Sequence, residues 1–216
     1  MTRPTLSVLL AAAAALAACV APRGPAFADR DYPGTLLPAG TFATDLLWQQ
    51  RITATWGEGA QRGFDAAVQK QAAVLTVLGL SPAGYAGFVI LLRGTDVELQ
   101  NQAGEDLPFP PRFVLLDVQR TFYPWLPMPT PRDGEREGVV AGERVRERWA
   151  DGRLQQRRFE RLDATPPGTI TITYDWTGTE PSWQAPRHVV LDNGWFGYRL
   201  TVDTHAETRL PPPAGG

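Results

Sequence analysis

The sequence predicts a mainly β (α+β) fold: a strongly curved antiparallel sheet of about ten strands, an incomplete barrel, wrapped over one internal helix. Three observations support this prediction. Apolar and polar residues alternate in many short segments, glycines bound two nearly continuous apolar runs, and one segment in mid-chain has helical periodicity. A hydrophobic content of 43% and seven tryptophans indicate a folded chain, long enough for one domain with a sizeable core.

The chain begins with an apolar leader. Leu6–Leu16, an apolar stretch of 11 residues, follows Arg3, and it is shorter than the about 20 residues that span a bilayer. The leader ends in Leu16-Ala17-Ala18-Cys19, which contains the single cysteine of the chain. This pattern resembles the signal of bacterial lipoproteins, which is cut before a cysteine that then carries diacylglycerol and an amide-linked acyl chain.

We therefore expect residues 1–18 to be a signal peptide and Cys19 to be a lipid anchor, because two or more acyl chains hold a protein stably at a membrane. A lone cysteine suits this use, since it has no second thiol with which to form a disulfide. The alternative is an ordinary secretory signal with an unrelated cysteine. Val20 stands where inner-membrane lipoproteins of enteric bacteria carry Asp. The resemblance therefore implies an outer-membrane location, with the domain facing the periplasm.

Segments rich in proline, glycine and alanine flank the expected domain. Residues 19–41 comprise the acylated cysteine and a stretch without sustained periodicity, which predicts a flexible tether. Residues 210–216 predict a disordered tail. The domain is therefore expected over residues 42–209.

Five strands are expected before the helix. Residues 46–56 place Leu46, Trp48, Ile52, Ala54 and Trp56 on one face. Alternation continues at Phe64, Ala66 and Val68, and again at Val97 and Leu99. Because one face of each strand is polar, these are antiparallel strands packed on one side. The runs "AVLTVLGL" and "GFVILLRG" are nearly continuous apolar runs bounded by glycine and are expected to be covered on both faces.

The helix is expected over residues 112–125. Leu115, Val118, Phe122 and Leu126 recur at helical spacing. Proline is tolerated in the first turn of a helix, where Pro111 stands, and Pro124 closes the segment. Asp117 on this helix is expected to be a solvated surface carboxylate.

Strands also follow the helix. "ERVRERWADGRLQQRRFER" predicts a hairpin that turns at Asp151-Gly152, and "TITITYDW", "RHVVLD" and "WFGYRLTVDT" predict the last strands. Seven arginines of this hairpin are interleaved with Glu143, Glu147 and Glu160. This mixture favours a solvated mixed-charge surface over a site for anionic headgroups or an acidic partner. The arginines are Arg144, Arg146, Arg148, Arg153, Arg157, Arg158 and Arg161.

Composition excludes several function classes. The chain has 21 basic and 23 acidic residues, so it lacks the basic surplus of a nucleic-acid binder. Two histidines and one cysteine make a zinc site unexpected, and no cofactor is expected. The motifs of serine hydrolases, zinc proteases and phosphate loops are missing from the sequence, so we do not expect an enzyme.

Several weak motifs occur in an order that resembles the LolA/LolB superfamily of lipoprotein carriers, and most of all LolB-like outer-membrane lipoproteins. "LWQQRITATWGEGAQRGFDAAV" resembles the opening strands of the family, and "LTVLGLSPAGYAGFVILL" resembles a loop between two strands. "PPRFVLLDVQRTFYPWLPMP" stands in the place of the internal helix, and "ITITYDW" with "PRHVVLDNGWFGYRLTVD" resembles the closing strands. The likeness covers roughly residues 46–205.

The resemblance implies a LolB-like fold and a hydrophobic cavity that binds a lipid or an acylated ligand, either a lipoprotein or a glycolipid. It also implies a LolA-like periplasmic carrier as a partner. In the loop that inserts lipoproteins in LolB, this chain has Ala83 in place of a protruding leucine, and Tyr85 is the other candidate for membrane contact. Two alternatives remain open: a structural or interaction lipoprotein with a filled core, and an envelope enzyme acting on lipid or glycan. The expected cavity lining is Trp48, Ile52, Trp56, Phe64, Phe88, Val97, Leu115 and Phe122.

Overall fold

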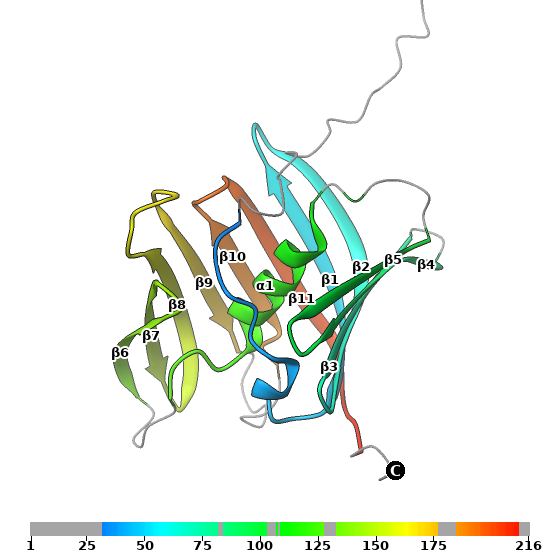
Figure 1. Cartoon of the computed structure of the whole chain (residues 1–216), viewed down its shortest axis with the longest axis horizontal. Helices are drawn as coiled ribbons and strands as arrows, with labels where there is room; N and C mark the ends of the chain where they lie inside the picture. The colour runs from blue at the N-terminus through cyan, green and yellow to red at the C-terminus, as the bar shows by residue number, and fades with distance from the viewer. Residues whose placement is uncertain are drawn as a thin grey trace, which may run out of the picture.

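The protein is described by a computed structural model that covers residues 32–81, 84–102, 107, 109–127, 133–176 and 185–211. The predicted signal peptide, Cys19 and Ala83 lie outside these residues. Figure 1 shows a curved sheet with one helix on its concave side. The strands before helix α1 (Pro111–Phe122) are β1 (Leu46–Trp56), β2 (Ala60–Gln71), β3 (Val74–Leu80), β4 (Ala86–Arg93) and β5 (Asp96–Asn101). Those after it are β6 (Gly134–Val140), β7 (Glu143–Ala150), β8 (Arg153–Arg161), β9 (Thr169–Asp175), β10 (His188–Asn193) and β11 (Tyr198–Arg209).

The strands form one sheet in the order β5-β4-β3-β2-β1-β11-β10-β9-β8-β7-β6. Every neighbouring pair is antiparallel. The sheet does not close, because β5 and β6 are its two edges. The predicted fold class is confirmed, with eleven strands among the described residues where the sequence predicts about ten.

Residues with positive φ form the turns of the two hairpins β6–β7 and β7–β8, which follow helix α1 in the chain. Asp151 and Gly152 both have positive φ, 54° and 69°, as the two-residue turn of a hairpin requires. The predicted turn between β7 and β8 is therefore confirmed. Ala141 and Gly142 form the corresponding two-residue turn between β6 and β7, with φ of 50° and 79°.

Helix α1 ends at Phe122, three residues before the predicted end. Tyr123 precedes Pro124, a position that disfavours helical backbone, and it is extended at φ −81° and ψ 152°. Carbonyls of the last turn also accept hydrogen bonds from donors outside the helix. Trp125 Nε1 donates to Gln119 O at 2.8 Å, and Tyr174 OH donates to Thr121 O at 2.9 Å.

Residues 32–42, which we call the strap, run along helix α1 before the chain enters β1 (Figure 1). Tyr32 and Leu36 are buried and belong to the same hydrophobic core as the helix and sheet. Helix α1 is consequently covered on all sides: Phe113 and every residue from Leu115 to Thr121 are buried. Residues 32–41, which the sequence places in the tether, are thus part of the folded domain.

Side chains of helix α1 hold the backbone of the strap. The Gln119 amide bonds both the N–H of Leu37, at 2.8 Å, and its carbonyl, at 2.6 Å. Arg112 donates to the carbonyls of Tyr32 and Gly34, and Arg120 donates to that of Pro33 at 2.8 Å. Gly34 has a φ of +124°, and an added Cβ there would lie 2.6 Å from Arg120 Nη2. The strap thus needs glycine at this position to approach the helix.

Candidate functional site

The concave face of strands β1 to β5 carries most of the predicted cavity lining. Trp48, Phe88 and Leu115 are buried members of the core. Ile52, Phe64 and Phe122 are partly buried and pack against that core. Trp56 is partly buried and Val97 is 39% exposed.

Strand pairing and ring contacts bring several of these side chains together. Ile52 lies opposite Phe64 in the register of β1 and β2. The rings of Phe64 and Phe88 have centroids 6.0 Å apart, and those of Trp48 and Phe122 are 4.6 Å apart. The two aromatic pairs therefore link β2 to β4 and β1 to helix α1.

Phe88 fits on this face because its neighbour on β3 lacks a side chain. Gly79 lies opposite Phe88, and a Cβ built on Gly79 would lie only 2.2 Å from the Phe88 ring. The ring of Phe88 therefore occupies the space above Gly79, and this part of the concave face is filled.

The face becomes exposed at its β5 edge. Val97 and Leu99, which we call the apolar margin, lie opposite Leu92 and Ile90 in the register of β4 and β5. Residues paired in this way project from the same face of a sheet. Leu92 and Ile90 are fully buried, whereas Val97 and Leu99 are 39% and 40% exposed. The margin thus continues the apolar core into solvent.

The loop between β3 and β4 presents a further exposed side chain, that of Tyr85. Tyr85 is 76% exposed, and its N–H donates to Ser81 Oγ at 3.3 Å. Its neighbour Ala83, the other predicted membrane contact, lies outside the described residues.

A buried polar network, absent from the sequence prediction, joins the strap to the helix and sheet. Tyr32 and Tyr198 both donate their hydroxyls to the carboxylate of Asp117, the latter at 2.6 Å. Asn193 Nδ2 donates to the hydroxyl of Tyr32 at 2.9 Å. We call Tyr32, Asp117, Asn193 and Tyr198 the strap latch.

Burial raises the pKa values of the titratable side chains in the latch. Desolvation raises the pKa of Asp117 from 3.8 to about 6, although the hydrogen bonds from Tyr198 and Tyr32 oppose this rise. Desolvation also raises the pKa of both tyrosines well above the ordinary value. The predicted solvated role of Asp117 is wrong, because its side chain lies between helix and strap and is only 6% exposed.

An arginine–glutamate pair stands beside the latch. Arg120 is fully buried and donates to Glu143 Oε1 of β7 at 2.9 Å. Its guanidinium also lies 4.9 Å from the ring centres of Tyr32 and Trp195, within cation–π range. The latch and this pair therefore connect helix α1 to the strap and to strands β7, β10 and β11.

Two hollows lie away from the predicted lining. One, of about 290 Å³, is on the outer face of β6 to β8. The other, of about 510 Å³, lies between β6 and the segment after helix α1, and it is lined by Trp125, Leu126, Pro127, Arg136, Glu137, Gly138, Val139 and Val140. Among the described residues, no three His, Cys, Asp or Glu side chains gather as metal ligands. No helix in that same part of the chain is long and apolar enough to cross a membrane.

The family model described as "Protein of unknown function (DUF3261)" matches residues 47–206. The chain belongs to the DUF3261 family. The match covers all eleven strands apart from the first residue of β1 and the end of β11, together with helix α1. No curated protein matches this DUF3261 chain.

Three solved structures align with most of this chain. A LolA superfamily protein from Nitrosomonas europaea is 11% identical, with 82% of this chain and 91% of that chain covered and a TM-score of 0.49. A domain from Vibrio parahaemolyticus named for outer membrane lipoprotein sorting is 10% identical, with coverages of 79% and 88% and a TM-score of 0.46. A DUF1329 family protein from Desulfovibrio piger is 8% identical, with coverages of 78% and 87% and a TM-score of 0.37.

The open antiparallel sheet over one helix, which the sequence motifs predict, is confirmed. At these identities and TM-scores the likeness carries neither a superfamily nor a ligand over to this DUF3261 chain.

Proposed function

We propose that this protein is a lipid-anchored protein of the outer membrane, facing the periplasm, that binds the acyl chain of a lipoprotein or glycolipid without covalent chemistry. Cys19 would carry the anchor. The acyl chain would bind on the concave face of β1 to β5, in contact with the lining residues predicted from the sequence.

The apolar margin is the observation that carries this proposal. Val97 and Leu99 extend a buried core into solvent on the concave face. Partly buried Ile52 and Phe64 line the same face on β1 and β2. An acyl chain lying along the margin would bury apolar area, at about 0.8 kcal/mol for each methylene group removed from water.

The exchange of a chain between membrane and protein would involve little net change in free energy, since both environments are apolar. A tether at Cys19 would keep the margin beside the bilayer at high effective concentration. Tyr85, exposed on the β3–β4 loop, is the proposed membrane contact. A LolA-like carrier is the proposed source of acylated ligand.

A structural or interaction lipoprotein is the second candidate, and the filled interior favours it. Leu115 of helix α1 is fully buried, and so are Leu75 and Ile90 of the sheet. In this alternative the core serves stability alone, and partners would recognise the outer surface.

One matched pair of substitutions separates the two candidates. Val97→Asp places a charge on the apolar margin of β5, whereas Val139→Asp places the same charge on the outer face of the other edge strand, where Val139 is 60% exposed. A carboxylate facing an acyl chain costs several kcal/mol unless it is paired. We therefore expect Val97→Asp to weaken the binding of a fluorescent fatty acid at least about tenfold, and Val139→Asp to leave it unchanged.

The test uses residues 20–216, which contain every described residue and hence the whole core. Circular dichroism checks that both variants fold. Equal affinities for the two folded variants, or no probe binding by the wild type, would exclude acyl binding at the margin. Phe122 is a poorer test position, because its ring packs on Trp48 and a charge there would disturb the core.

A further inference from the structure

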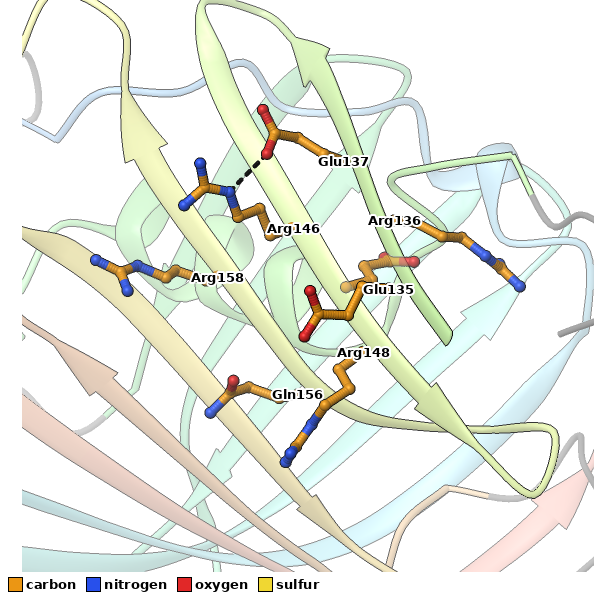
Figure 2. A pocket seen from close by; sticks show the side chains of 8 residues that line it. Glu135, Arg136, Glu137, Arg146, Arg148, Gln156 and Arg158 are labelled. Carbon is orange, nitrogen blue, oxygen red and sulfur yellow. Dashed lines mark hydrogen bonds and ion pairs between the residues drawn. The ribbon is translucent and has the colours of Figure 1, made fainter. Parts of the chain in front are cut away.

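Four arginines line a hollow on the convex face of the sheet, opposite helix α1, and three of them project from that face. Arg146 and Arg148 of β7 and Arg158 of β8 alternate with buried residues, so they project outward. Figure 2 shows them around this hollow of about 290 Å³. The hollow is lined by Glu135, Arg136, Glu137, Arg146, Glu147, Arg148, Gln156 and Arg158, and we call it the arginine hollow.

Strand register sets these side chains beside one another. Arg146 lies opposite Arg158, and Arg148 lies opposite Gln156. Directly opposed residues on one face have Cβ atoms about 5 Å apart, and like charges in that position repel. Arg148 and Arg158 are diagonal neighbours on the same face, about 7–8 Å apart, so both side chains can reach one anion.

Only part of this positive charge is neutralised. Glu137 accepts from Arg146 at 2.6 Å and from Arg144 at 3.1 Å. Arg148 and Arg158 form no ion pair with any described residue. Their guanidinium donors therefore face solvent within a hollow.

The geometry points to a binding site for a phosphate group, held by the guanidinium groups of Arg148 and Arg158 with the amide of Gln156 between them. A guanidinium donates two parallel hydrogen bonds to phosphate oxygens. A phosphate offers more acceptor oxygens than a carboxylate and up to two negative charges, which suits two cations from different strands. Glu135, opposite Arg148, would repel the phosphate.

This inference goes beyond the proposed acyl binding and is independent of it, because the two surfaces lie on opposite faces of the sheet. The phosphate could belong to a lipid headgroup or to a soluble phosphate ester, and two measurements on residues 20–216 distinguish these sources. One titrates inorganic phosphate and follows the arginine side-chain NMR signals. The other measures co-flotation with phosphatidylcholine vesicles that do or do not contain phosphatidic acid.

We expect Arg148→Gln and Arg158→Gln each to weaken phosphate binding about three- to tenfold, and Glu135→Gln to strengthen it about twofold. Arg51→Gln is the matched control, because Arg51 is an exposed arginine of β1, paired with Asp65 at 3.1 Å and far from the hollow in the strand order. Circular dichroism verifies that each variant folds.

If Arg148→Gln and Arg158→Gln weaken the binding of inorganic phosphate alone, the site takes a soluble phosphate. If they also weaken co-flotation with vesicles that contain phosphatidic acid, the site takes a lipid headgroup. Either result supports the site. The inference is overturned if neither ligand binds, or if Arg51→Gln weakens binding as much as the hollow variants do.

Discussion

Asp117 shows how burial can turn a carboxylate into a pH-sensitive element of the fold. Its pKa rises from 3.8 to about 6 because helix, strap and sheet exclude water from it. Two tyrosine hydroxyls donate to it, yet they do not fully offset the cost of desolvation. At neutral pH the latch therefore holds a buried negative charge that lowers the stability of the domain.

The sign of the pH dependence follows. Between pH 3.8 and 6 the folded protein holds a proton on Asp117 that the unfolded chain has released. This contribution is fully present below pH 3.8 and is lost as the pH rises through 6, with a size of about 3 kcal/mol. We expect urea unfolding to show this fall in the wild type and a much flatter profile between pH 4 and 7 in Asp117→Asn. Parallel profiles for the two proteins would show that Asp117 does not titrate in this range.

At the scale of elements, helix α1 acts as a substitute strand for the strap. The Gln119 amide satisfies both backbone groups of Leu37, as a neighbouring strand would. Arg112 and Arg120 take three more strap carbonyls. Hydrogen bonds from the helix, rather than a sheet ladder, hold the strap against the core.

Gln119→Leu should release the strap. It leaves the N–H and carbonyl of Leu37 without partners, and the loss of buried hydrogen bonds costs about 1–3 kcal/mol for each unsatisfied group. We expect a free energy of unfolding lower by about 2–4 kcal/mol and faster proteolytic cleavage within residues 32–42. Gln100→Leu on exposed β5 is the control, and its stability should change by less than about 0.5 kcal/mol. Slow cleavage of Gln119→Leu, equal to that of the control, would contradict this role.

Elements with strong local signals were predictable from sequence, whereas long-range contacts were not. The alternation around Trp48 and Ile52 gives the inner face of β1, and Pro111 and Pro124 bracket the helix. The strap has no period, because its partners are helix side chains about 80 residues away. The burial of Asp117 depends on that same contact. Phe113, an apolar residue four positions earlier on the same helix stripe, was the one local hint.

At the scale of the whole molecule, the anchor would decide where the domain works. We expect Cys19→Ala to prevent acylation and to release the protein from the outer membrane into the soluble periplasm, since the leader ends in Leu16-Ala17-Ala18-Cys19. Membrane fractionation and labelling with radioactive palmitate measure this. Val20→Ala, which keeps the cysteine, should stay with the membrane. Co-fractionation of Cys19→Ala with the outer membrane would disprove the anchor.

The strand order also dictates when the domain can fold. Among the described strands, β11 is synthesised last, lies between β1 and β10, and alone links the five strands before the helix to the rest of the sheet. Its register with β1 joins Leu46 to Arg209 and Trp56 to Tyr198, contacts that span most of the domain. Such distant pairings form slowly, because the long intervening chain must be ordered first. The two halves of the sheet therefore cannot join until β11 is available, and a ribosome or a secretion channel that still holds β11 keeps them apart.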